Sequence, residues 1–547
     1  MDVSSLSTNG IQALTSAQLG ALATAQVRAL TSTQVGSFTT SQLAALNANQ
    51  AAALDTVDLA QLNSAQVRAL TADAVAGLTT AQITNLTTAQ TQSLTTAQVV
   101  ALGTAQVAAL TTAQLANLST DQVAALRSSQ VIGIETADLV TLTTDTLGAL
   151  TSTAFAGLTT GQVARLTTAQ IVGLNATQVS AMTTDQVVAI TTAQAAQMTT
   201  SSAAALSANQ VAALETVDLA KLNTAAINAL TTAAISGLST GQIASLTTAQ
   251  VVALGTDQVK QLGTAQIASL TTAQAAALTS DQVSAMSTAQ VANITTADIA
   301  KLSTSAIAVL NSAQSKFLTT SQLAVLTSAQ VAALSTTSAT ILSSAQVAAI
   351  TTAGIAKLST DAIQALTTSG IRGLSSDQVS AITTVQLAAV TSTQVAGLTT
   401  AQVVALTTAQ AAKLSTDQIS ALTTAQVNNL ETADLAKLST DAVVSLNSAQ
   451  LKALSTAQIS AMTSAQTAAL TSDQVGSLST PQLAALLVGT QMSAMTTAQV
   501  AALTTAQIVA LTTLQASQLS SAQVAAMSTA QIAAIETVDF ANISTAA

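Results

Sequence analysis

One eight-residue sequence repeats, with small changes, from Leu6 to the end of the chain. Its consensus is Leu-Thr-Thr-Ala-Gln-Val-Ala-Ala, which segments 94–118 and 398–406 follow closely. So short and persistent a repeat is typical of a solenoid or fibre made by stacking one small unit. We expect a lead-in at residues 1–5, an array over 6–486, a register slip of one extra residue at 487–495, and a continued array over 496–547.

The apolar positions of this octad fit neither a plain strand nor a continuous helix. We number the octad so that its Leu, as in Leu14 and Leu22, is position 8; Val, Ile or Leu then occupies position 5, as in Leu19 and Val27. The apolar spacings alternate between three and five, whereas an alternating strand needs even spacings. In an uninterrupted helix these residues would spiral around the surface, because eight residues advance about 80° beyond two full turns.

Capping residues indicate that each octad begins its own helix. Position 1 is nearly always Thr or Ser, and position 4 is nearly always Gln, as in Gln18, which is the pattern of a capping box. Asp121, Asp417 and the only proline, Pro481, fall at the second helical position, where negative charge and a missing N–H are tolerated best. The pattern predicts an all-α superhelical solenoid of very short capped helices, one per octad and about two turns each. A β-solenoid, favoured by the Thr and Val content, is the alternative.

Larger side chains extend this assignment. Phe38, Phe155 and Phe540 occupy apolar positions and are predicted to lie in the core, whereas Phe317, at position 7, is predicted to be exposed. The glycines occupy no fixed octad position, so we expect no turn that requires a positive φ. Methionines that replace the position 8 Leu are predicted to fill the core; they are Met182, Met198, Met286, Met462 and Met527.

Paired acids are the one constellation that resembles a site. The pairs are Asp55/Asp58, Glu135/Asp138, Glu215/Asp218, Glu431/Asp434 and Glu536/Asp539, the first three 80 residues apart. Octads that come soon after these pairs, or after the related octad at Thr295, lack Gln and carry Ala74, Ala226, Ala306 or Ala442 instead. The first four pairs are candidate calcium ligands, but two carboxylates fall well short of the roughly 6–8 oxygens that Ca²⁺ takes. We therefore favour a structural interpretation, in which the second acid replaces Gln in the capping box. No other metal or cofactor site is predicted.

Composition narrows the functional classes. Cys, His, Trp and Tyr are absent, which removes thiolate chemistry and the commonest general base and metal ligand, and we expect no enzyme. Only 7% of residues are charged and the net charge is −10, which argues against nucleic acid as a partner. Polar residues interrupt every octad, so no apolar run approaches the ~18 residues of a transmembrane segment. The first residues, MDVSSLSTNG, do not resemble a conventional signal peptide.

The LTTAQ-V-AL pattern resembles the octapeptide arrays of large bacterial secreted and surface proteins, some of them adhesin-like. The resemblance covers essentially the whole chain and implies export and a structural or adhesive use, without any catalytic residue. We therefore expect a self-assembling extracellular or cell-surface protein, such as a filament, stalk or surface-layer subunit, that associates end to end or laterally and is exported without a conventional signal peptide. The alternative is a surface-binding region whose regular Thr rows contact ice or polysaccharide.

Overall fold

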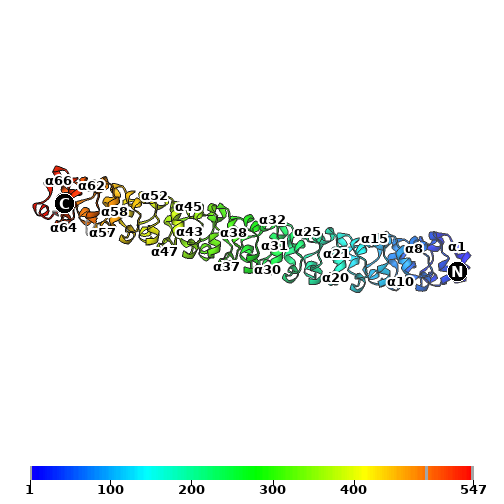
Figure 1. Ribbon diagram of the computed structural model, residues 1–547. Helices are drawn as coiled ribbons and strands as arrows, with labels where there is room; N and C mark the ends of the chain where they lie inside the picture. The colour runs from blue at the N-terminus through cyan, green and yellow to red at the C-terminus, as the bar shows by residue number, and fades with distance from the viewer. Residues whose placement is uncertain (1–2, 487–490, 544–547) are drawn as a thin grey trace. The chain divides into compact units, whose positions relative to one another are not determined.

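The chain folds as an all-α repeat. The computed structural model describes residues 3–486 and 491–543, where it has one 3₁₀-helix, η1 (Val3–Ser5), 67 short α-helices and no strand. These residues form two units: Met1–Ala277, with α1 (Thr8–Gln12) to α34 (Thr272–Ala277), and Leu278–Ala547, with α35 (Ser280–Ala285) to α67 (Thr537–Phe540). In each unit the helices follow one another around and along the unit in chain order (Figure 1). The predicted solenoid of short helices is confirmed, and the described residues exclude the β-solenoid.

Each octad forms one helix that begins after an extended residue at position 1. Thr95, with φ −74° and ψ 159°, precedes α12 (Thr96–Ala101). The Thr95 N–H donates to Gln98 Oε1 at 2.7 Å, and the Gln98 N–H donates to Thr95 Oγ1 at 3.2 Å, so the predicted capping box is present. The helices are four to seven residues long, shorter than the predicted two turns. They end early because the position 8 residue, such as Leu102 with ψ 136°, is already extended.

Positions 5 and 8 form the core, and positions 1 to 3 face outward in nearly every octad. Phe38 and Phe155 are buried and Phe317 is exposed, as predicted. The prediction for Phe540 is wrong: its side chain is 56% exposed, because it lies in the last described helix with no later coil packed on it. The five methionines at position 8 are buried, as predicted.

Where position 4 is glutamine, it joins its coil to the one before it. Gln98 Nε2 donates to the carbonyl oxygens of Val67 and Leu70, 31 and 28 residues earlier, at 3.0 and 2.6 Å. The same bonds recur in the second unit, where Gln426 Nε2 lies 3.0 Å from Val395 O and 2.7 Å from Leu398 O. Each such Gln therefore caps its own helix with Oε1 and binds the preceding coil with Nε2. We call this pair of bonds between coils a glutamine bridge.

A coil does not contain a whole number of octads. Helices three octads apart pack together, as α16 (Ser128–Val131) does with α19 (Ser152–Ala156), whereas the glutamine bridge reaches back four octads. Ser16 Oγ donates to Ser41 O, 25 residues later, at 3.0 Å. Contacts that span 25 to 31 residues place between three and four octads in a coil. Like positions therefore do not stack on one another from coil to coil.

The register slip is absorbed within one coil. Residues 487–490 lie outside the described residues, and α61 (Gln491–Ala494) follows them. Gln499 Nε2 donates to carbonyls 32 and 29 residues earlier, one more than usual, because its bridge spans the extra residue. Gln523 returns to the usual spacings of 31 and 28. The bridge thus forms on both sides of the slip.

Glycine at position 7 permits the closest approach of two coils. None of the described glycines adopts the left-handed region, as predicted, but a Cβ on Gly373 would lie 2.3 Å from Ser344 O. We expect Gly373→Ala to lower the free energy of unfolding by about 1–3 kcal/mol, because backbone would have to move. Gly161 is the matched control: a Cβ there would lie 4.0 Å from its nearest neighbour, and Gly161→Ala should be neutral or stabilising. Urea denaturation measures both, and equal effects would contradict this packing.

Candidate functional site

The acidic pairs each lie within a single octad. The first acid is the exposed N-cap residue, and the second is a buried residue at the third helical position, where other octads carry Gln. The helices concerned are α7 (Thr56–Leu59), α17 (Thr136–Leu139), α27 (Thr216–Leu219), α54 (Thr432–Leu435) and α67. The structure therefore places one carboxylate of each pair outside the coil and the other inside it.

The acids do not form the predicted capping box. At the N-cap, the side chains of Asp55, Glu135, Glu215 and Glu431 accept no cap hydrogen bond. The second acid is a residue with one methylene fewer than Gln and no amide N–H, so it supplies no glutamine bridge. The prediction that Asp simply replaces Gln in the box is wrong in these octads.

Hydroxyl groups of the preceding coil contact two of the buried carboxylates. Ser32 Oγ donates to Asp58 Oδ1, and Thr112 Oγ1 donates to Asp138 Oδ1, each at 2.5 Å and each across 26 residues. In these contacts the earlier coil donates the hydrogen bond and the later coil accepts it, which is the reverse of the glutamine bridge. At each of these two places, a charge-assisted hydrogen bond to a buried carboxylate thus joins a coil to the one before it, where the glutamine bridge is missing.

Asp434 is the exception among these acids. Its side chain is 1% exposed, and neither carboxylate oxygen has a hydrogen-bond partner in the protein. Burial, with a further contribution from the Glu431 carboxylate, raises the pKa of Asp434 from 3.8 to about 6. Burial followed by the charge of Glu215 likewise raises the pKa of Asp218. Sequence reasoning finds these residues but gives no reason to separate Asp434 from the others.

The raised pKa of Asp434 makes stability depend on pH. Because its pKa is higher in the folded chain, its contribution to stability is fully present below pH 3.8 and is lost as pH rises through about 6. We expect a higher unfolding temperature at pH 5 than at pH 7.5, and Asp434→Asn should reduce this difference. The other charged groups in its own octad and in the octads packed against it, 407–414 and 455–462, are Glu431, Lys437 and Lys413.

Asp441→Asn is the control for Asp434→Asn, because it removes the same charge from an exposed position on the next helix, α55 (Thr440–Val444). It should leave the pH dependence unchanged. If both variants flatten the dependence equally, overall charge and not the buried Asp434 carboxylate is responsible.

Calcium at the acidic pairs remains a prediction. Among the described residues no acidic pair is joined by a third Asp or Glu, so the structure does not bring separate pairs together. Calcium would have to take its remaining oxygen ligands from backbone carbonyls and water. The predicted calcium ligands are Asp55, Asp58, Glu135, Asp138, Glu215, Asp218, Glu431 and Asp434.

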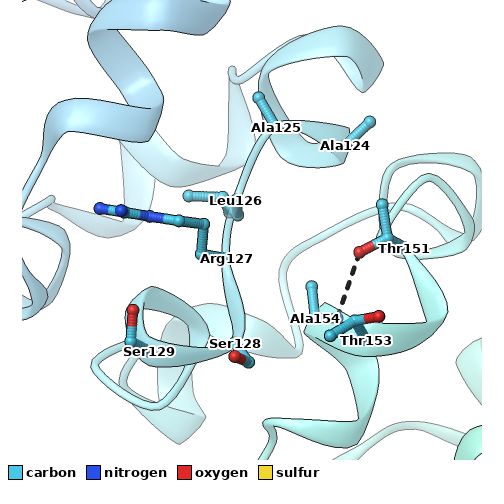
Figure 2. A pocket seen from close by; sticks show the side chains of 9 residues that line it. All are labelled: Ala124, Ala125, Leu126, Arg127, Ser128, Ser129, Thr151, Thr153 and Ala154. Carbon is cyan, nitrogen blue, oxygen red and sulfur yellow. Dashed lines mark hydrogen bonds between the residues drawn. The ribbon is translucent and has the colours of Figure 1, made fainter.

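Shallow grooves open between helices that lie three octads apart, and three of them contain an arginine. One, of about 410 Å³, runs between α16 and α19 and is lined by Leu126, Arg127, Ser128 and Thr151, among others (Figure 2). Figure 2 also shows Thr151 Oγ1 accepting from the Ala154 N–H at 3.1 Å, the cap of an octad that has no Gln. The other two contain Arg165 and Arg372 beside Thr or Ser hydroxyls. Each of these grooves therefore presents Ser or Thr hydroxyl groups and one arginine guanidinium group.

No helix in the described part of the chain combines the length and apolar character needed to cross a bilayer. No curated protein matches the chain. The model of the ALTTAQ repeat family matches it repeatedly, and the matches together cover most of its length: residues 1–48, 51–88, 107–192, 211–288, 291–328 and 355–480. These matches show that the chain belongs to the ALTTAQ repeat family, and the short helices that recur with the octad agree with them.

Proposed function

We propose that this chain is a structural subunit that is exported and assembles with copies of itself at the cell surface or outside the cell. The observation that carries the proposal is the glutamine bridge, which recurs through both units and binds most coils to the coil before them. Such an array gains stability from contacts between neighbouring repeats and can be lengthened without a change of design. Its outward positions are mostly Thr, Ser and Ala, which leave little chemical variety for recognising a specific small molecule.

One surface of the second unit supports lateral association. Phe317 and Ile341 occupy position 7 of octads that are three apart, and their side chains are 54% and 38% exposed. The helices α39 (Ser312–Lys316) and α42 (Thr336–Ile341), which end next to Phe317 and at Ile341, pack against each other. A pair of large apolar side chains exposed on two packed helices, among small polar residues, is typical of a contact with another protein. We propose that a second copy of the chain covers Phe317 and Ile341.

Electron microscopy and sedimentation over a concentration series test the proposal. We expect uniform polymers or lattices as concentration rises, and a shift toward single particles in Phe317→Ser. The control Thr320→Ala changes a polar residue of the following octad and should leave assembly unchanged. Single particles of constant sedimentation coefficient at every concentration would overturn self-assembly.

Binding through regular Thr rows receives less support. Thr at position 1 is engaged as a helix cap, and the offset between coils prevents position 2 hydroxyls from stacking in a row along a unit. Some position 2 hydroxyls also bind the next coil, as Thr104 Oγ1 does with Ser129 O at 2.7 Å. A thermal-hysteresis assay separates the two functions, because an ice-binding face would produce activity in single particles.

A further inference from the structure

Three nearly complete coils have no glutamine at position 4. In residues 135–158 the three octads carry Asp138, Thr146 and Ala154; in 215–238 they carry Asp218, Ala226 and Ala234; in 351–374 they carry Gly354, Ala362 and Gly370. Since a coil holds between three and four octads, each group removes the bridges from most of one turn. We call these segments the glutamine-free coils.

Few side-chain hydrogen bonds replace the missing bridges. Thr112 donates to Asp138 at 2.5 Å across the first of these boundaries, and Asn223 Nδ2 donates to Met198 O at 3.1 Å across the second. Within the described residues, no side-chain hydrogen bond joins 351–374 to the coil before it. By contrast, the octads at 79–102 make a bridge with every one of Gln82, Gln90 and Gln98.

Close backbone packing remains where the bridge is absent, and it also occurs at Gly133, whose octad keeps its bridge. Each glutamine-free coil has a glycine at position 7 of its third octad: Gly157, Gly237 and Gly373. A Cβ on these residues would lie 2.7, 2.8 and 2.3 Å from the backbone oxygens of Ser128, Ala208 and Ser344, each 29 residues earlier. This contact consists of close packing between backbone atoms. Few hydrogen bonds cross it, so few have to break when the two coils separate.

Two of the shallow grooves lie at these same boundaries. The groove lined by Ser128 and Ala154 lies beside the Gly157 contact, and the groove lined by Ser344 and Arg372 lies beside the Gly373 contact. The first of these grooves is lined by Ala154, which occupies the position where bridged octads place a buried glutamine. A groove, few hydrogen bonds and a glycine contact therefore occur together at 135–158 and 351–374, and the last two features also occur at 215–238.

We propose that the boundaries before residues 135–158, 215–238 and 351–374 are joints, at which neighbouring coils separate reversibly while the glutamine-bridged coils stay folded. The joints divide the array into blocks of glutamine-bridged coils, and coils separate at the joints while the blocks stay folded. In a structural subunit, such joints let a unit bend or open under load without loss of the whole array, because the stability of repeat proteins is distributed over nearest-neighbour contacts.

Hydrogen exchange of the full chain, followed by mass spectrometry, tests the joints. We expect amides of 135–158, 215–238 and 351–374 to exchange about tenfold faster or more than those of 79–102, because bridge bonds are absent at one face of each joint coil. Equal protection in the joint coils and in 79–102 would overturn the proposal.

Two variants test the cause of the difference. Replacing Gln82, Gln90 and Gln98 together by alanine should raise exchange in 79–102 to the level of the joints. Ala226→Gln with Ala234→Gln should slow exchange in 215–238. If the triple variant leaves 79–102 as protected as before, the bridges do not set the opening of coils and the joints are rejected, whether or not the double variant folds.

Discussion

Replacing Phe155 by alanine is expected to lower the free energy of unfolding by about 3–5 kcal/mol, the largest effect that we predict for a single substitution in this chain. Phe155 occupies position 5 of α19, its side chain is 0% exposed, and it is the largest fully buried side chain of the described chain. Its removal leaves a cavity that the short helices on either side cannot close without losing their caps. Urea denaturation followed by circular dichroism measures the change.

Phe317→Ala is the matched control for Phe155→Ala. Phe317 is 54% exposed at position 7, so the same truncation should change the free energy of unfolding by less than about 1 kcal/mol. Both measurements need dilute protein, since Phe317 belongs to the proposed contact between copies. Equal losses for the two variants would mean that position 5 is not the core of the coil.

Gln90→Ala is expected to cost about 2–4 kcal/mol, because two bonds to the preceding coil disappear and buried carbonyls lose their donor. Gln90 Nε2 donates to Leu59 O at 3.0 Å and to Leu62 O at 2.7 Å, and Oε1 accepts from the Thr87 N–H at 2.8 Å. The substitution therefore removes a helix cap and a bridge at once. Hydrogen exchange around residues 59–62 should rise together with the loss of stability.

Gln92→Ala in the same helix, α11 (Thr88–Ser93), separates the bridge from the residue type. Gln92 lies at position 6 and is exposed, so its truncation should leave stability within about 0.5 kcal/mol of the parent chain. A Gln92 variant as unstable as the Gln90 variant would show that helix propensity, and not the bridge, controls the array.

The helices can be predicted because their signals are local. A capping residue at position 1, Gln at position 4 and two apolar positions specify one short helix within eight residues, and all four features appear in the structure around Thr95 and Gln98. The predicted helix length is too long, because the cap pattern marks where a helix begins, whereas its end is set by the extended position 8 residue that joins it to the next octad.

The second role of Gln cannot be derived from local pattern alone. Its amide reaches carbonyls 28 and 31 residues earlier, and such contacts depend on the size of the coil. A signal is nevertheless present: Glu would complete a capping box as well as Gln and would suit the helix dipole better, yet position 4 is Gln. The preference indicates that this position needs a hydrogen-bond donor as well as an acceptor.

The acidic pairs show the same division between local and long-range information. Their place in the first helical turn follows from the sequence, whereas the partners of Asp58 and Asp138 lie 26 residues away, and the unpartnered state of Asp434 depends on the coil packed against it. The prediction for Phe540 fails for a related reason, since an apolar position is buried only where another coil covers it.

The return of the usual bridge spacing at Gln523, after the longer spans at Gln499, bears on how such a chain can change in length. Each octad finds its position by contact with the coil immediately before it, and no octad depends on its distance from either terminus. A gained or lost octad therefore shifts all later octads together and leaves every later bridge able to form. Evolution can adjust the reach of the array in steps of one octad, without a compensating substitution elsewhere.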